Sequence, residues 1–566
     1  MLPLSRKAQG GLSIMRYFIL LIIFIAGSTA SAEIHYVSPG ESIQSAVLLA
    51  LDLDTVLVED GVYEESVVLY GRTITLASRF LLDGDTSHIN NTIIRPWNPN
   101  ADTASCLIYG SNEATEGKTV GLTLADGRGT TSFVQPEDRV GGCVYVRNSV
   151  ATLEHCCVLN GSAFVGGGIS VEGEQDTPNT ALAILNNVVI EACHAEDSGG
   201  GVFVWRASAI ISNCTFEKDS CANLHGGLQC YRSHAEVDEC VFRHCYGWKG
   251  GMEMQQCTGH VRYCLFEQNG ARPINFGYCH FSSINSPIEF SGNILRDGAT
   301  NHFAAGWSGS PAPSVFGNVI ENNVSTYLTA TVLIGWYGET DFAYNIIRNN
   351  LNNHGGAVQA FQETDARIHH NVIKNNRDLI DNFGSGFMCV SGCRPTLDSN
   401  LFIENQGVAA GWGFNEETHM LDMRNNWWGD ASGPYHPTYN PHGLGDTLLS
   451  DSILFIPWLT AAPDTAMPTS ISDRERPEQP GTWHIMNLFP NPFNSEFTII
   501  LAGFTRSDFS LRLYDILGRE AAVMHEGALT GGSLTFIAPA NLASGVYFLR
   551  AADRSQVDTR KVVLLK

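Results

Sequence analysis

The chain repeats a short pattern about every 27 residues along most of its length. In each repeat one residue, often cysteine in the first half and asparagine in the second, opens a short apolar couplet. We align these positions at Cys157, Val188, Cys214, Cys240, Cys264, Asn293, Asn318, Asn345, Asn371, Asn400 and Asn426. Such short segments leave no room for a helix in each period, so the repeat predicts a solenoid of stacked strands.

A pair of glycines opens a second short strand in each early repeat. The pairs are Gly141-Gly142, Gly167-Gly168, Gly200-Gly201, Gly226-Gly227 and Gly250-Gly251. We interpret them as residues that allow a strained turn. The asparagines should point inward at a bend, where amides one coil apart, about 4.8 Å, form a hydrogen-bonded ladder. We therefore predict one parallel β-helix of roughly fifteen coils over residues 33–459; a β-propeller would need longer periods with hairpin turns.

Composition limits the partners and the chemistry of the cysteines. The 566 residues include 34 Lys and Arg against 58 Asp and Glu, which gives a net charge of −24. We therefore expect neither nucleic acid nor an anionic membrane surface as the main partner. Fifteen cysteines would suit a disulfide framework in an exported protein. Because they follow the repeat, we favour stacked core thiols, with Cys389 and Cys393 as the best local pair.

The N-terminus has the pattern of a secretory signal peptide over residues 1–32. Arg6, Lys7 and Arg16 precede an apolar run, residues 17–26, and small residues lead to a cleavage site after Ala32. The run is about ten residues long, too short to span a bilayer core of about 30 Å. We expect an exported mature chain with no transmembrane span.

The repeat segment resembles the right-handed parallel β-helix (pectin-lyase-like) superfamily. Its start, Ser42-Ile-Gln-Ser-Ala-Val47 followed by Gly61-Val-Tyr63-Glu64, is similar to the usual cap and first coils, with a capping helix over residues 42–51. Its end, Asn425-Asn-Trp-Trp-Gly429, is similar to a terminal coil whose tryptophans seal the core. The resemblance implies an all-β fold.

A separate domain is expected after a proline-rich linker over residues 460–485. Residues 486–566 alternate as in a small immunoglobulin-like β-sandwich. Four motifs, Phe489-Pro-Asn-Pro-Phe-Asn494, Leu513-Tyr-Asp-Ile-Leu-Gly-Arg519, Leu542-Ala-Ser-Gly-Val-Tyr-Phe548 and Lys561-Val-Val-Leu-Leu-Lys566, resemble a C-terminal sorting domain of the type IX secretion system. The resemblance implies export to the surface or medium of a Gram-negative bacterium, with the secretion machinery as partner. An accessory immunoglobulin-like module is the alternative.

The outer face of the strand after each glycine pair is the expected working surface of this fold. Alternation gives one outward row, Tyr145, Ser170, Phe203, Gln229 and Glu253, and a second row, Arg147, Glu172, Trp205, Tyr231 and Gln255. Aromatic rings beside charged groups suit a sugar chain. We predict that the ligand-binding residues are Trp205, Arg206, Gln229, Tyr231, Arg232 and Glu253, with Trp307, Trp336, Tyr337 and Trp412 as a possible extension. The alternative is a solvated face with scattered aromatics.

Catalysis has only three candidate residues. A lyase of this fold needs a basic side chain beside a uronate, which could be Arg232 or Lys249, with Glu253 as a ligand or acid. Glu172 and Glu253 should lie about 14 Å apart, beyond the roughly 9.5 Å limit for hydrolytic carboxylate pairs. Signature motifs of pectin methylesterases and pectate lyases are missing. We expect no cofactor or dedicated metal site, with weak Ca²⁺ binding by loop carboxylates as the exception.

Three functions remain open at this stage. The leading hypothesis is an exported monomer that binds a polysaccharide or surface glycan. The first rival is a polysaccharide lyase acting on uronate-containing chains. The second is a non-catalytic spacer or adhesin, in which rigid length is the function.

Overall fold

The computed structural model describes two parts of the chain. The first comprises residues 32–465 without 111, 115, 133–137, 175–179, 272–276, 328–329, 354, 380–383 and 413–419. The second comprises 484–489, 496–502, 505–515, 519–530, 533–539, 542–552 and 557–564. The predicted signal peptide up to residue 31 and most of the predicted linker lie outside the described residues.

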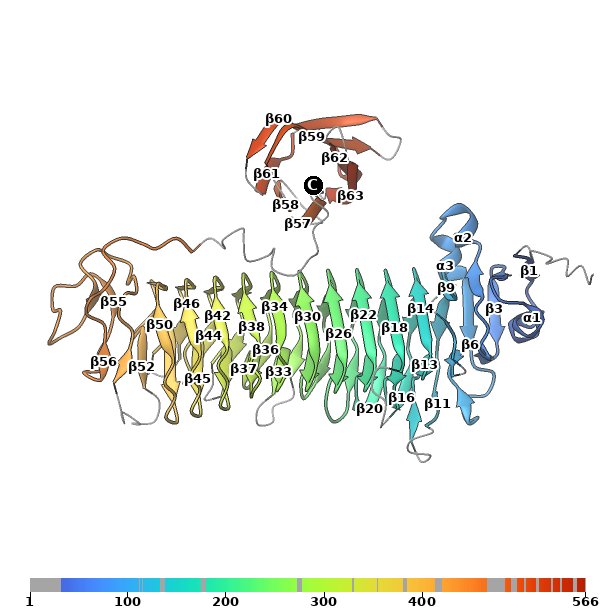
Figure 1. Ribbon diagram of the computed structural model, residues 1–566, viewed down its shortest axis with the longest axis horizontal. Helices are drawn as coiled ribbons and strands as arrows, with labels where there is room; N and C mark the ends of the chain where they lie inside the picture. Colours follow the sequence, from blue (N-terminus) through green and yellow to red (C-terminus); the bar gives the residue numbers. More distant parts are fainter. Residues whose placement is uncertain are drawn as a thin grey trace, which may run out of the picture.

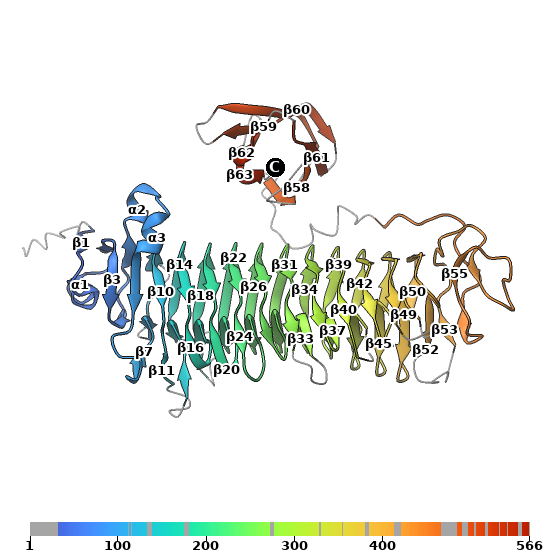
Figure 2. The same cartoon turned by 180° about the vertical axis from the view of Figure 1, so that it is seen from behind.

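The first part is a rod of stacked coils in which four sheets run along the length (Figures 1 and 2). We name them sheets A, B, D and C, in the order in which one coil passes through them. They contain 14, 13, 12 and 13 strands, slightly fewer than the roughly fifteen coils that we expected. Pairing is parallel throughout, except where β11 meets β7 and β12 in sheet D.

Sheets A and B form two of the faces. Sheet A contains β1 (Ile34–Val37), β2 (Thr55–Val58), β5 (Thr75–Ser78), β9 (Lys118–Val120), β14 (Val150–Glu154), β18 (Leu182–Asn186), β22 (Ser208–Ser212), β26 (His234–Asp238), β30 (Thr258–Arg262), β34 (Ile288–Ser291), β38 (Ser314–Phe316), β42 (Asp341–Ala343), β46 (Arg367–His369) and β50 (Thr396–Asp398). Sheet B contains β3 (Gly61–Glu64), β6 (Thr92–Arg95), β10 (Thr123–Ala125), β15 (Cys157–Leu159), β19 (Val189–Glu191), β23 (Thr215–Glu217), β27 (Val241–Arg243), β31 (Leu265–Glu267), β35 (Ile294–Arg296), β39 (Val319–Glu321), β43 (Ile346–Arg348), β47 (Val372–Lys374) and β51 (Leu401–Ile403).

Sheets D and C complete each coil. Sheet D contains β7 (Thr103–Ala104), β11 (Gly129–Thr131), β12 (Arg139–Val140), β16 (Ser162–Val165), β20 (His194–Ser198), β24 (Ser220–Cys221), β28 (Tyr246–Gly247), β32 (Gly270–Ala271), β36 (Ala299–Thr300), β40 (Val324–Ser325), β44 (Leu351–Asn352) and β48 (Arg377–Asp378). Sheet C contains β4 (Val67–Val68), β8 (Leu107–Tyr109), β13 (Val144–Arg147), β17 (Ile169–Glu172), β21 (Val202–Trp205), β25 (Leu228–Tyr231), β29 (Met252–Gln255), β33 (Tyr278–Ile284), β37 (Phe303–Ser308), β41 (Val332–Gly335), β45 (Val358–Phe361), β49 (Phe387–Val390) and β52 (Ala410–Trp412).

Both ends of the rod are closed as the sequence predicts. Helix α1 (Ile43–Leu49) covers the N-terminal end, where the Ser42 hydroxyl caps it and Ile43 and Val47 enter the core. Two short helices, α2 (Phe80–Asp83) and α3 (Ser87–Asn91), extend from the first coils. At the other end lie β53 (Leu421–Asp422), β54 (Pro434–Tyr435), β55 (Gly445–Thr447) and β56 (Ile453–Leu454). There Trp428 is fully buried and stacks on Phe402, with ring centroids 4.7 Å apart.

The asparagine ladder lies at the corner between sheets A and B. The Nδ2 of Asn345 donates to Asn371 Oδ1 at 3.0 Å, and Asn371 repeats this bond to Asn400 at 3.0 Å. Each amide also donates to a backbone carbonyl of the preceding coil, so both N–H groups of the buried side chain are hydrogen-bonded. The predicted stacking is therefore confirmed. One position is corrected: Cys157 pairs with Val189, so Cys156 is the residue in the inward slot.

A second ladder, which the sequence analysis missed, follows five residues later at the corner between sheets B and D. Its amides belong to Asn323, Asn350, Asn376 and Asn405, and it ends on the carboxylate of Asp446. One coil lacks the amide because Gly298 occupies that position. The buried ring of His280 fills the gap, in contact with Asn269 at 3.2 Å and Asn323 at 2.9 Å.

The paired glycines are needed for a different reason from the one that we expected. Positive φ angles occur at Gly141, Gly166 and Gly199, but not at Gly167 or Gly200. A Cβ on Gly167 would lie 2.4 Å from the carbonyl oxygen of Gly200, in the next coil. Close approach of backbones between coils, rather than turn strain, therefore requires most of these glycines.

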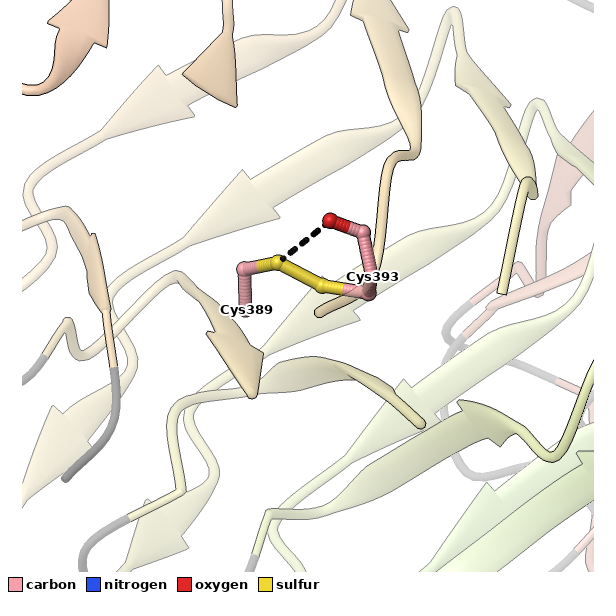
Figure 3. Close-up of a disulfide and its surroundings, with 2 residues drawn as sticks. All are labelled: Cys389 and Cys393. Carbon is pink, nitrogen blue, oxygen red and sulfur yellow. Dashed lines mark hydrogen bonds between the residues drawn. A yellow bond between two sulfur atoms is a disulfide. The ribbon is translucent and has the colours of Figure 1, made fainter. Parts of the chain in front are cut away.

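The cysteines are almost all free. All fifteen lie within the described residues; thirteen are thiols, and twelve of these are buried. Cys389 and Cys393 form the one disulfide, across a short turn after β49 (Figure 3). The cysteine side chains thus serve mainly as small core residues, as the repeat predicts.

The C-terminal part is all-β and consists of two antiparallel sheets. One contains β57 (His484–Phe489), β58 (Glu496–Ala502) and β61 (Ser533–Ile537); the other contains β59 (Thr505–Asp515), β60 (Glu520–Thr530), β62 (Gly545–Ala552) and β63 (Val557–Leu564). Phe497 and Ile499 of one sheet share a core with Leu511, Leu513 and Leu549 of the other. This packing agrees with the predicted β-sandwich. Across the described residues, no helix combines the length and apolarity needed to cross a bilayer.

Candidate functional site

The two outward rows predicted on sheet C are in register. Phe203 pairs with Gln229, and Gln229 pairs with Glu253. In the second row Trp205 pairs with Tyr231, which pairs with Gln255. Inward-facing β-branched residues such as Val202 and Val204 fix this alternation, because a one-residue slip would expose them.

The first row is outward-facing yet largely covered. Gln229 is 5% exposed and Glu253 is 1% exposed. Residues that precede sheet C pack over the row: Val140 contacts Tyr145 in a small apolar cluster, and His225 and Lys249 lie against Glu253. The corner between sheets D and C is thus filled on its outer side, and Gln229 and Glu253 do not contribute accessible surface to a ligand strip.

Three charged or titratable residues meet in this covered corner, and we call His225, Lys249 and Glu253 the corner cluster. Lys249 Nζ contacts Glu253 Oε1, and His225 Nε2 lies 2.5 Å from Glu253 Oε2. Burial alone would raise the pKa of Glu253, but the neighbouring His225 and Lys249 outweigh it and lower that pKa below its usual value. Glu253 is therefore held as the anion of a buried ion pair with Lys249.

Arg232 is not part of the corner cluster. It follows β25 at the opposite end of the strand, is exposed, and donates from Nε to Gln256 Oε1 at 2.8 Å. The structure thus brings together Lys249 and Glu253, but places the other candidate base, Arg232, three residues beyond Gln229, which is in the row of Glu253.

The accessible part of the predicted ligand surface consists of two aromatic–arginine pairs on adjacent coils. We call these four residues the aromatic–arginine strip: Trp205, Arg206, Tyr231 and Arg232. The guanidinium carbon of Arg206 lies 5.4 Å from the Trp205 ring centre, and that of Arg232 lies 5.1 Å from the Tyr231 ring centre. Both arginines have positive φ angles, 50° and 53°, which turn the chain at the corner between sheets C and A. Cation–π contacts of this kind hold ring and cation as one unit.

The neighbouring coil on the N-terminal side places a carboxyl group beside the strip. Glu172 pairs in register with Trp205 and accepts a hydrogen bond from the Tyr145 hydroxyl at 2.8 Å. Burial raises the pKa of Glu172, and that hydrogen bond opposes the shift. Glu172 lies in the row of Trp205 and Glu253 in the row of Gln229, so the two are not placed as a pair of hydrolytic carboxylates.

The four aromatic residues proposed as an extension divide into two groups. Trp307 and Trp412 face the core and are buried, because their positions in the strands are inward ones. Trp336 and Tyr337 lie at the outer corner between sheets C and A, and Trp336 packs against Phe361 with ring centroids 5.5 Å apart. Phe361 was not among the predicted residues; the alternation of β45, in which Val358 and Ala360 face the core, was the signal for an outward ring at this position.

Metal ligands do not gather anywhere in the part of the chain that the structure describes. No group of three or more His, Cys, Asp or Glu side chains there could hold an ion. His369 and His370 contact each other and His369 contacts Asp341, but they do not amount to such a group.

Two family models match segments of the chain, one in each part. Residues 137–334 match a family described as a right handed beta helix region, and residues 487–565 match one described as a secretion system C-terminal sorting domain. A search of curated proteins finds no match. Among solved structures, a mutant of the PL6 family alginate lyase AlyGC is 8% identical, over 69% of this chain and 84% of that one, with a TM-score of 0.16. At that score the likeness supports no functional argument.

Proposed function

Because the chain joins a right-handed parallel β-helix to a secretion-system sorting domain, we propose that it binds a polysaccharide or surface glycan outside the cell. The sorting domain accounts for export to the cell surface or medium, with the type IX machinery of a Gram-negative bacterium as the partner that reads it. The β-helix then presents the aromatic–arginine strip to the ligand.

The strip is the single observation that carries this proposal. Trp205 and Tyr231 are half-buried rather than core residues, and they repeat one coil apart at the same height. Flat rings spaced in this way can stack on successive pyranose faces. The guanidinium groups of Arg206 and Arg232 supply planar donors for hydroxyl or carboxylate oxygens of the same chain.

Catalysis by a uronate lyase is supported less well. Lys249 is buried and already paired with Glu253, so using it as a base would require breaking that ion pair. Arg232 is accessible, but its guanidinium donates to the amide of Gln256 rather than to an acidic group. A spacer or adhesin without glycan binding remains the outcome if the strip has no ligand.

The proposal is tested with the purified full-length exported protein on an array of bacterial and plant polysaccharides. We expect binding that falls at least tenfold in the Trp205→Ala, Tyr231→Ala double variant. Tyr246→Ala removes an exposed tyrosine from sheet D and serves as the matched control, with no expected effect. Ultraviolet absorbance of unsaturated uronates follows lyase activity in the same samples. Binding that the double variant leaves unchanged would refute the strip.

A further inference from the structure

We infer that the glycan site extends along the rod to a second subsite at Trp336, Tyr337 and Phe361, and that the ligand is a linear polymer lying parallel to the rod axis. This inference rests on the proposed function of the aromatic–arginine strip. It adds the second contact, the orientation of the ligand and its minimum length.

The two aromatic groups lie along one corner of the rod. Equivalent turn residues follow one another from coil to coil, because the N–H of each donates to the carbonyl just before the next one: Arg232, Gln256, Asn285, Gly309 and Trp336. Each of these five residues has a positive φ angle. The second subsite therefore presents its rings at the same corner between sheets C and A as the arginines of the first.

The separation of the two groups is fixed by the coil spacing. Four coils separate Arg232 from Trp336, which corresponds to about 19 Å at 4.8 Å per coil. A pyranose unit in an extended chain advances by close to one coil spacing. A chain of about six or more units would thus contact both groups, whereas a trisaccharide would contact only one.

The surface between the two groups favours passage of such a chain. Gln256 and Asn285 are exposed amides, and Gly309 has no side chain to rise above the corner. A Cβ on Gly309 would meet the Asn285 side chain, so the small residue is required by that neighbour. The corner between the subsites therefore presents the polar side chains of Gln256 and Asn285, which suit the hydroxyl-rich edge of a sugar chain.

The second subsite has its own accessible ring. Tyr337 is 58% exposed, and its hydroxyl accepts from Gln362 Nε2 at 3.4 Å. The Trp336 ring packs against Phe361, and Gly335 must lack a side chain because a Cβ there would crowd the phenylalanine. Trp336 and Phe361 thus support the patch, while Tyr337 offers a face to the solvent.

The test uses oligosaccharides of defined length with the full-length exported protein. Isothermal titration would compare oligogalacturonates, an acidic series that the arginines should favour, with neutral cello-oligosaccharides, each of two to eight units. We expect affinity to rise at least tenfold between three and seven units, because a second contact on one chain adds an intramolecular binding step. Tyr337→Ala should abolish that rise, so that the seven-unit chain binds no more tightly than the trisaccharide.

The outcomes separate this inference from the proposed function. If Trp205→Ala weakens binding at every length but no step appears with length, the second subsite is refuted and the strip stands. If neither series binds, or Trp205→Ala has no effect, both are overturned. Tyr246→Ala again serves as the control, and thermal unfolding of each variant checks that the fold is retained.

Discussion

Replacing Asp219 by asparagine should stabilise the rod. Asp219 occupies a rung of the second ladder, where later coils carry asparagine, and it is fully buried. Its Oδ1 accepts the backbone N–H of Cys193 at 2.9 Å, but its Oδ2 has no hydrogen-bond partner. An amide would keep the first bond. Its NH₂ would donate to a backbone carbonyl of the preceding coil, as the equivalent Asn269 donates from Nδ2 to the Phe242 carbonyl at 2.8 Å. Satisfying a buried polar atom in this way is worth about 1–3 kcal/mol of unfolding free energy.

The sign of the pH dependence makes this prediction specific. Burial raises the pKa of the Asp219 carboxyl well above its ordinary value. The folded state therefore holds the proton more tightly than the unfolded state, and the carboxyl destabilises the fold increasingly as pH rises above about 4. The advantage of Asp219→Asn should be largest at pH 7 and should shrink toward pH 4.

Differential scanning calorimetry at several pH values measures the effect. We expect the Asp219→Asn midpoint to exceed that of the wild type by a few degrees at pH 7. Asp102→Asn, which alters an exposed carboxylate, is the matched control and should change little at any pH. An unchanged or lowered midpoint at pH 7 would refute the reasoning that this rung requires an amide.

Three further substitutions test other parts of the fold. Asn345→Ala removes two donated and two accepted hydrogen bonds, and should lower the free energy of unfolding in urea by about 3–5 kcal/mol. The control Asn186→Ala, on the outer face of sheet A, should change it little. Gly167→Ala places a Cβ against a backbone carbonyl of the next coil and should reduce the yield of folded protein, whereas Gly110→Ala meets no atom within 4 Å and should be tolerated. Lys249→Met should lower the free energy of unfolding by about 3–5 kcal/mol, because it leaves the buried Glu253 carboxylate unpaired. Adding Glu253→Gln should recover most of this loss. Equal free energies of unfolding for the single and double variants would contradict the buried ion pair.

The architecture could be predicted because every coil has the same physical requirement at the same position, and this produces a period in the sequence. Stacked amides such as Asn345 and Asn371 need the same residue at the same point of each coil, so their spacing is visible in the sequence. The second ladder was harder to see, because its rungs change identity: Asp219, Cys245 and then Asn269 occupy equivalent places. His280 is invisible to any alignment by period, since it reaches a vacant rung from a different strand.

The site could be predicted only in part. Alternation correctly separated the rows of Phe203 and Trp205, because a strand has a strict period of two. It could not show that the outer corner beside Glu253 is filled, since that depends on the angle between sheets D and C. It also failed to assign Trp307 to the core, because β33 and β37 are longer strands with a shift in register.

Hydroxyl-radical footprinting with mass spectrometry tests the central claim most directly, because it reports on the side chains that should bind the glycan. The full-length protein would be oxidised with and without the polysaccharide that it captures best on the array. We expect oxidation of Trp205 and Tyr231 to fall several-fold, while Trp97, 77% exposed near the N-terminal end, is oxidised equally in both samples. Unchanged oxidation of Trp205 and Tyr231 under saturating polysaccharide would contradict the account.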